Sequence, residues 1–202
     1  MPAIETPVTL LLLAGGLSYL LGSVPFGVVM ARLFGLGDLR SIGSGNIGAT
    51  NVLRTGNRVA AGLTLILDAG KGAAAVLAVR ALLGADAAQL AGLAAFLGHL
   101  YPVFLGFAGG KGVATFLGTL VALAWPVGLA ACALWLVVAA VTRYSSLSAL
   151  LAASGSVVVA PLMGYGALTG LLAVLAAVII WRHRENVARL RAGTESRIGR
   201  KD

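Results

Sequence analysis

One polar stretch of this chain combines glycines, hydrogen-bond donors and cations without any acidic side chain between Asp38 and Asp68. It reads RSIGSGNIGATNVLRTGNR and occupies residues 40–58. Glycines let backbone N–H groups approach a ligand, hydroxyl and amide side chains add donors, and arginines add positive charge. This combination favours a phosphate-binding loop. An ordinary solvated loop is the alternative that the residues do not exclude. The residues concerned are Gly43, Ser44, Gly45, Asn46, Gly48, Thr50, Asn51, Arg54 and Arg58.

The glycine spacing within this stretch also matches the dinucleotide fingerprint. That fingerprint requires a preceding strand, whereas here an apolar segment of helical length comes first. We therefore take the match as accidental.

A second glycine-rich stretch, GFAGGKGVAT at residues 106–115, surrounds a single lysine. Lys111 stands between Gly109, Gly110 and Gly112 at the expected start of a helix, where the helix dipole adds partial positive charge. Neither serine nor threonine follows the lysine, so this is not an ATP-binding P-loop. We expect a second anion site here.

Two ionisable side chains lie within an apolar run, in the sequence DAGKG. Asp68 and Lys71 are three residues apart and share one helical face. A charge near the middle of a bilayer costs roughly 2.5–3.5 kcal/mol, so the presence of this pair within an apolar segment has to be explained. It is either a mutually neutralising pair or part of a polar cavity. For His99, near the end of another apolar run, we expect a hydrogen-bonded structural role.

The segment RHRENVARLRAG, residues 182–193, follows the last apolar run. His183 and Asn186 lie about one helical turn apart there, among four arginines. The segment is either a lipid-contacting helix or a third part of the site. Metal-ligand motifs such as HExxH and CxxC do not occur in the sequence. The residues therefore predict a phosphate-binding site with neither metal nor cofactor.

The elements that must position these residues are apolar helices. The 202 residues are 59% hydrophobic and 11% charged, and the mean hydropathy is +0.96. This composition predicts an all-α, polytopic membrane protein, as one domain over residues 1–202. We count seven spans, of which the fourth is too short to cross fully. They are Val8–Phe34, Val59–Leu83, Ala87–Phe107, Val113–Trp125, Pro126–Thr142, Leu147–Met163 and Ala167–Trp181.

The basic residues predict how these spans are oriented. Of the 15 lysines and arginines, 13 fall on one side, and Arg80 alone falls at the opposite face. By the positive-inside rule the N-terminus is outside, and the C-terminus and the polar site are in the cytoplasm. The formal charge of +8 suggests attraction to anionic lipid headgroups rather than nucleic acid.

Five motifs together resemble the bacterial acyl-phosphate:glycerol-3-phosphate acyltransferase family, PlsY. They occur in family order across nearly the whole chain, and they are GSVPFG, DLRSIGSGNIGATNVLR, DAGKG, HLYPVFLGFAGGKGVAT and RHRENVARLRAG. The resemblance implies a seven-helix enzyme of the bacterial inner membrane. Such an enzyme transfers an acyl group from acyl phosphate to the sn-1 hydroxyl of glycerol 3-phosphate, giving lysophosphatidic acid and phosphate.

The resemblance also implies roles for particular residues. Ser44 and Lys111, with Asn46 and the glycines, would stabilise the developing oxyanion and the departing phosphate. Arg54, His183 and Asn186 would hold glycerol 3-phosphate, and the proton would pass to His183 or to a substrate phosphate. The functional set implied is Ser44, Asn46, Thr50, Asn51, Arg54, Lys111, Ser146, His183 and Asn186. Ala108 stands where many members carry lysine, which removes one cation near the phosphates.

Two other classes of protein remain compatible with the residues. Several helices with a lysine within a span and a short fourth helix could line a pathway for a small phosphorylated anion. A transporter, however, has less reason to collect its cations at one face. A lipid-binding structural subunit is the third possibility.

Overall fold

The computed structural model describes residues 3–199, and every regular element in that part of the chain is a helix. The α-helices are α1 (Val8–Ser23), α2 (Phe26–Leu33), α3 (Ala49–Arg54), α4 (Arg58–Leu83), α5 (Ala85–Leu100), α6 (Val113–Leu123), α7 (Trp125–Thr142), α8 (Ser145–Leu162), α9 (Thr169–Arg182) and α10 (Arg184–Arg191). Three short 3₁₀ helices are η1 (Leu39–Ser41), η2 (Val103–Leu105) and η3 (Gly166–Leu168). The all-helical class predicted from the sequence is confirmed.

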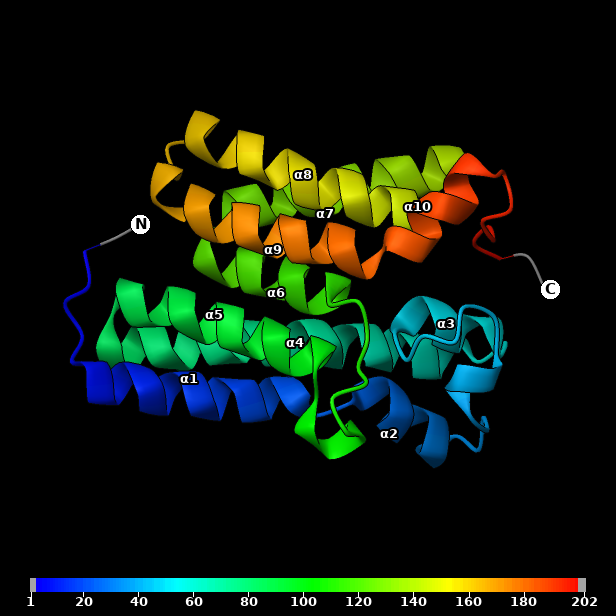
Figure 1. Cartoon of the computed structure of the whole chain (residues 1–202), viewed down its shortest axis with the longest axis horizontal. Coiled ribbons are helices and arrows are strands. Elements are labelled where there is room, and N and C mark those ends of the chain that lie inside the picture. Colours follow the sequence, from blue (N-terminus) through cyan, green and yellow to red (C-terminus); the bar gives the residue numbers. More distant parts are fainter. Residues whose placement is uncertain (1–2, 200–202) are drawn as a thin grey trace.

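The long helices lie side by side along the longest axis of the molecule (Figure 1). Helices α1, α4 and α5 pack together as one group, and α7, α8 and α9 form a second group. Helix α6 lies between the groups and packs on α4 and α7. Helices α2, α3 and α10 gather at one end of the bundle, which we call the polar end (Figure 1).

Five helices in residues 3–199 are long and apolar enough to cross a membrane, and the bent pair α9–α10 raises the number to six. The α6 helix has only 11 residues, about 16 Å at 1.5 Å per residue, as expected for an incomplete fourth span. The integral membrane class is thus supported by length and composition. The count of seven and the orientation stay predictions.

The first predicted span, Val8–Phe34, is interrupted where the sequence reads Val24-Pro25. Proline has no N–H to donate and disfavours helical geometry in the residue before it, and Val24 is accordingly extended. The Lys71 ammonium, from α4, donates to the Val24 carbonyl at 2.8 Å. The Val24 carbonyl at the break also accepts from the Phe26 amide at 3.2 Å, so Lys71 adds a side-chain partner from α4 to it.

Close packing of α1 on α5 depends on glycines, which have no side chain to keep the two backbones apart. A Cβ on Gly22 would lie 2.1 Å from the Ala95 carbonyl oxygen, and one on Gly98 would lie 2.2 Å from that of Tyr19. Small residues let backbones approach because lipid provides no hydrophobic drive between helices. These glycines hold the end of α5 where the second glycine-rich stretch begins.

Arg80 explains how the short α6 helix can end inside the bundle. Its guanidinium donates to the carbonyls of Ala122 and Leu123, each at 2.9 Å. Carbonyls at a helix C-terminus lack internal partners and attract cations. The lone arginine at the far end of α4 thus caps α6.

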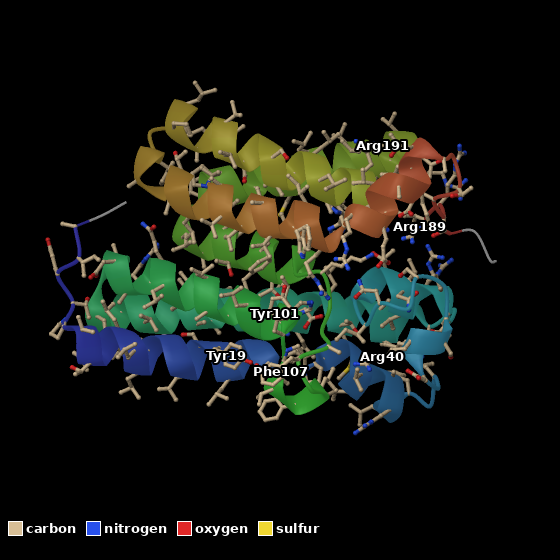
Figure 2. The ribbon with its side chains drawn as sticks, viewed as in Figure 1. Tyr19, Arg40, Tyr101, Phe107, Arg189 and Arg191 are labelled. Atoms are coloured by element: carbon tan, nitrogen blue, oxygen red, sulfur yellow. The ribbon has the colours of Figure 1, made fainter. Side chains whose placement is uncertain are left out.

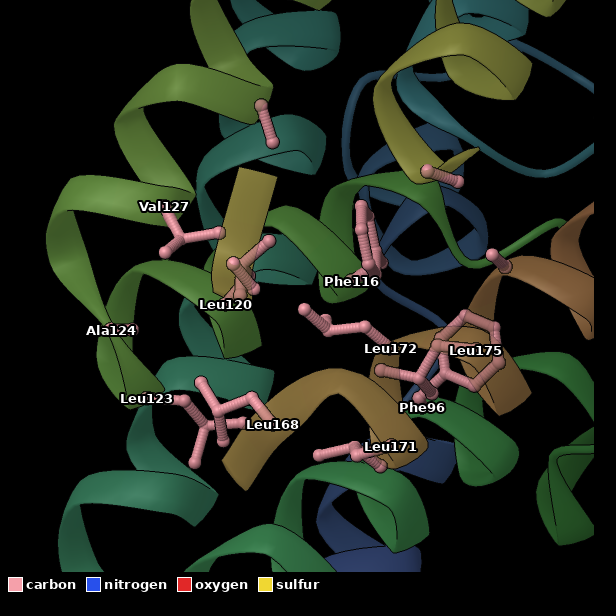
Figure 3. Close-up of a cluster of buried hydrophobic side chains, with 14 of the residues drawn as sticks. Phe96, Phe116, Leu120, Leu123, Ala124, Val127, Leu168, Leu171, Leu172 and Leu175 are labelled. Carbon is pink, nitrogen blue, oxygen red and sulfur yellow. The ribbon is translucent and has the colours of Figure 1, made fainter. Parts of the chain in front are cut away.

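Two clusters of buried apolar side chains support the fold. The larger joins α5, α6 and α9, with Phe96, Phe116 and Leu172 fully buried in it (Figure 3). The smaller lies beneath residues 40–58 and contains Met30, Leu39, Ile47, Val52 and Ala60. The first polar stretch of the sequence therefore has a core of its own.

Candidate active site

The described basic side chains gather at the polar end, apart from Lys71 and Arg80. Figure 2 shows Arg40, Arg189 and Arg191 there, from parts of the chain about 150 residues apart. Helices α2, α5, α7 and α9 end toward this region, while α4, α6 and α8 begin there. The gathering is what the positive-inside argument requires of one membrane face.

The first glycine loop, residues 42–48, contains a turn closed by a hydrogen bond from the Gly45 amide to the Ile42 carbonyl at 2.9 Å. Gly43 and Gly45 have φ of +49° and +65°, which favours glycine. A Cβ on Gly43 would lie 2.5 Å from Cδ of Arg54, so the loop and the arginine are in close contact. Asn51 fixes the loop: its Oδ1 accepts from the Ser44 amide at 3.2 Å, and its Nδ2 donates to the Leu39 carbonyl at 2.8 Å.

Other predicted residues of this loop take local positions. Gly48 precedes the first turn of α3, and the Asn46 side chain accepts from the Ile47 amide at 3.0 Å. Thr50 shares a hydrogen bond of 3.1 Å with Ser145, the neighbour of the predicted Ser146. Thr50 lies in α3, so the helix that follows the loop contacts the start of α8, far away in the sequence.

The second glycine loop, residues 106–112, folds back onto the end of α5. The amides of Gly109 and Gly110 donate to the carbonyls of Leu100 and His99, at 3.1 and 3.2 Å. Their own carbonyls accept from Arg182, and the Ala108 carbonyl accepts from Arg40. What these two glycines supply is close approach, since their N–H groups already have partners. Gly112, at φ +81°, packs on Phe96.

Lys111 projects from this loop to α10. Its ammonium donates to Oδ1 of Asn186 at 2.5 Å, across 75 residues of sequence. The side chain is half-buried, and burial together with the nearby Arg189 charge lowers its pKa. The structure thus brings together two residues that the sequence had placed in separate motifs.

Glu195 connects this pair to α8. One carboxylate oxygen accepts from Asn186 Nδ2 at 2.6 Å and from Ser146 Oγ at 2.7 Å, and the other accepts from Arg189 at 2.7 Å. It belongs to the tail segment, residues 193–199, that follows α10. A hollow of about 430 Å³ lies here, lined by Gly43, Ser44, Arg189, Gly193, Thr194, Glu195 and Ser196. Ser44 and Glu195 therefore line one hollow, and Lys111 is connected to Glu195 through Asn186.

A second hollow, of about 340 Å³, lies beside α3 and the start of α4. It is lined by Thr50, Leu53, Arg54, Gly56, Arg58, Ile198 and Gly199. Arg54, which takes part in both loop and tail contacts, donates to the Ser196 hydroxyl at 2.5 Å. The tail segment thus forms part of the wall of both hollows.

His183 lies at the turn between α9 and α10 and is buried. Its Nδ1 is 2.8 Å from the Ile179 carbonyl oxygen, which can only accept, so Nδ1 carries the proton. Burial, only partly offset by that hydrogen bond, lowers the pKa of His183 to about 4. The imidazole is neutral near pH 7.

The Asp68–Lys71 pair is buried within the bundle and includes His99. The Lys71 ammonium is 2.8 Å from Asp68 Oδ1, and His99 Nδ1 is 3.5 Å from the same oxygen. A Cβ on Gly110 would lie 2.3 Å from His99 Nε2. The cluster therefore joins α4, α5 and the second glycine loop. The close Asp68–Lys71 contact is the arrangement of a mutually neutralising pair. Among residues 3–199, no three His, Cys, Asp or Glu side chains group as metal ligands.

Four residues of this region were not singled out from the sequence. Arg40 and Arg182 hold the second glycine loop, and Arg189 and Glu195 bond each other beside Asn186. An acid in a strongly basic tail was a usable signal for Glu195. The arginines carried no such signal, because basic residues near a membrane are common.

Comparison with known proteins gives one consistent result. The sequence profile described as Glycerol-3-phosphate acyltransferase matches residues 11–193. The chain is similar to glycerol-3-phosphate acyltransferases of Jannaschia sp. (strain CCS1), at 66% identity over 98% of each chain, and of Cereibacter sphaeroides (strain ATCC 17025), at 67% identity over 100% of this chain and 96% of that one.

Two crystal structures share the fold as well as the sequence pattern. Both are of PlsY, described as an integral membrane glycerol 3-phosphate acyltransferase. The glycerol 3-phosphate form has a TM-score of 0.88 and 42% identity, covering 94% of this chain and 96% of that one. The lysophosphatidic acid form has a TM-score of 0.85 and 39% identity, covering 94% and 95%.

Proposed function

The chain belongs to the glycerol-3-phosphate acyltransferase family, and on that premise we propose that it transfers a fatty acyl group from acyl phosphate to the sn-1 hydroxyl of glycerol 3-phosphate. The products are lysophosphatidic acid and inorganic phosphate. The solved relatives in glycerol 3-phosphate and lysophosphatidic acid forms support the acceptor and the product. The acyl donor and the position of acylation rest on the motif resemblance and on the chemistry below.

The observation that carries the proposal is the meeting of distant polar segments at the polar end. Lys111, Asn186 and Ser146 come from the second glycine loop, α10 and α8, and Ser44 lines the hollow next to them. Both substrates carry phosphate, so bringing them together requires cations and N–H donors around each. Two adjoining hollows, each bordered by arginine, fit a pair of anions.

The reaction needs no covalent enzyme intermediate. The acceptor hydroxyl oxygen attacks the acyl carbonyl carbon, the new C–O bond forms, and the bond from that carbon to the phosphate oxygen breaks. Phosphate leaves with the electron pair. We assign Lys111 and Ser44 to the charge that develops on the carbonyl oxygen and on the departing phosphate. Arg54, Asn186 and Ser146 would hold the acceptor.

The proton of the acceptor hydroxyl passes, in this proposal, to a phosphate oxygen of a substrate. A general base works best when its pKa lies near the operating pH. His183, with a pKa of about 4, is a weak base at neutral pH, whereas a phosphate monoester has a second pKa of about 6. The protonated Nδ1 leaves Nε2 of His183 free to accept a hydrogen bond and orient the acceptor.

The location that we propose is the bacterial inner membrane, with the hollows facing the cytoplasm. The gathering of the described cations at the polar end supports this orientation. Such a site takes its water-soluble acceptor from the cytoplasm and its long-chain donor from the bilayer, and contact with membrane lipids follows. A reporter enzyme that works only in the cytoplasm should be active when it is fused after Asp202, and a reporter that works only outside the cytoplasm should not.

The direct test is an acylation assay on the protein purified in detergent. With labelled glycerol 3-phosphate and acyl phosphate, we expect lysophosphatidic acid and phosphate in equal amounts, without nucleotide and with a chelator present. A strict demand for acyl-CoA, or acylation at the second hydroxyl, would contradict the proposal. Uptake of glycerol 3-phosphate by proteoliposomes without product would instead favour a transporter.

A further inference from the structure

Glu195 is an acid in a region where every other feature favours anions. It is buried and paired with Arg189, and Lys111 lies close to Glu195, Arg189 and Arg182. A carboxylate near a phosphate site repels the substrate, whereas a neutral residue at this position would not. The position therefore needs a compensating role.

The contacts of the carboxylate show what that role can be. Both oxygens accept hydrogen bonds, and the three donors come from α8 and from two positions of α10. Burial by itself raises the pKa of the Glu195 carboxyl, but the hydrogen bonds from Ser146, Asn186 and Arg189 outweigh it and hold the pKa below the ordinary value. The group is an anion that only accepts.

An anion that only accepts fixes the direction of the Asn186 amide. The NH₂ of Asn186 must face Glu195, so its carbonyl oxygen must face away, toward Lys111. A lysine ammonium only donates, and it therefore needs that oxygen. If the amide turned over, an N–H group would point at the ammonium and the Lys111 bond would be lost.

We propose that Glu195 is a positioning residue for acyl transfer, which sets the Asn186 amide so that Lys111 is held beside the hollow that Ser44 lines. This role rests on the proposed function. Glu195 contacts neither substrate in this scheme, and it acts through Asn186 and, on α8, through Ser146. The ion pair with Arg189 keeps the carboxylate charged and in place.

The test compares Glu195→Ala and Glu195→Gln with Glu185→Gln. Glu185 lies on α10 rather than in the tail segment, is exposed, and pairs with Arg184 at 3.9 Å. We expect Glu195→Ala to lower kcat about 100-fold, since small misplacements of reacting groups have effects of that order. Glu195→Gln keeps one acceptor oxygen and should lose less. Glu185→Gln should match the wild type.

A double-mutant cycle separates positioning from a merely structural role. If Glu195 acts through Asn186, then Glu195→Ala should add less than about threefold to the loss already caused by Asn186→Ala. Full additivity of the two losses would overturn the proposal. So would a wild-type kcat in Glu195→Ala.

A second control addresses the tail segment. Arg143 holds that segment at Ile198, with its side chain 2.9 Å from the Ile198 carbonyl, and does not touch Glu195. Arg143→Ala should therefore leave kcat within about threefold of the wild type. An equal loss in both variants would mean that Glu195 only anchors the tail. No acylation by the wild type would overturn the proposed function and this role together, whereas an active wild type with an unaffected Glu195→Ala overturns this role alone.

Discussion

The chain removes two lysines from water in different ways. Lys71 lies within a span with its side chain 1% exposed, and it has a carboxylate, a histidine neighbour of that carboxylate and a backbone carbonyl around it. Lys111 lies half-buried outside the spans and bonds a neutral amide. A cation that is already paired with a carboxylate attracts an anionic ligand only weakly. A cation that bonds a neutral amide keeps a net positive charge, which can attract such a ligand. We therefore assign structure to Lys71 and chemistry to Lys111.

The largest effect that would test this difference is on turnover. Lys111→Ala should lower kcat by about 10²–10³, or roughly 2.7–4 kcal/mol, as for loss of a group that stabilises a developing negative charge. Its melting temperature should shift by less than about 4 °C. Initial rates and thermal unfolding in the same detergent measure both. A folded Lys111→Ala variant with full activity would contradict the assignment of a chemical role to Lys111.

The second test removes the buried pair, and the effect should fall on stability. Lys71→Met leaves Asp68 without its cation, at a cost of about 3–5 kcal/mol in the free energy of unfolding. The double variant Asp68→Asn, Lys71→Met should recover part of this loss because no unpaired charge remains. Activity per folded molecule should stay within about tenfold. An unchanged melting temperature with lost turnover would place Lys71 in the chemistry.

The smallest effect expected is on the pH dependence. Burial lowers the pKa of Lys111 below its ordinary 10.5, so kcat should fall as pH rises through that lowered value. In the same range the unfolded chain binds more protons at this lysine than the folded one, so its contribution to stability rises with pH. Rates and melting temperatures measured from pH 7 to 10 should therefore diverge. A parallel decline would indicate unfolding instead.

Much of the fold could be predicted because hydropathy is a property of local segments. The predicted Val59–Leu83 and Pro126–Thr142 correspond to α4 and α7 with starts one residue away. The break at Val24 was missed, because an apolar window averages over a single proline. The short α6 was expected, but its capping by Arg80 was not, since a cap between two helices depends on their packing.

For the site, composition identified the glycines, Lys111, Asn186 and the loop around Ser44 as polar positions that an apolar chain would not otherwise keep. It could not tell which of them meet. The order of the donors around Glu195, and hence the direction of the Asn186 amide, depends on contacts between residues 9 to 75 positions apart. Hydrogen bonds over such separations leave no periodic pattern in a sequence.

The sequence by itself determined that the chain is helical and membrane-embedded and that its cations fall on one side, since these follow from segment hydropathy and residue type. Only the tertiary structure decided which of the two lysines is neutralised and which is held by an amide. The physical reason is that the state of a charge depends on the atoms within a few ångströms of it. For Lys111 those atoms come from parts of the chain that meet only after the helices have packed.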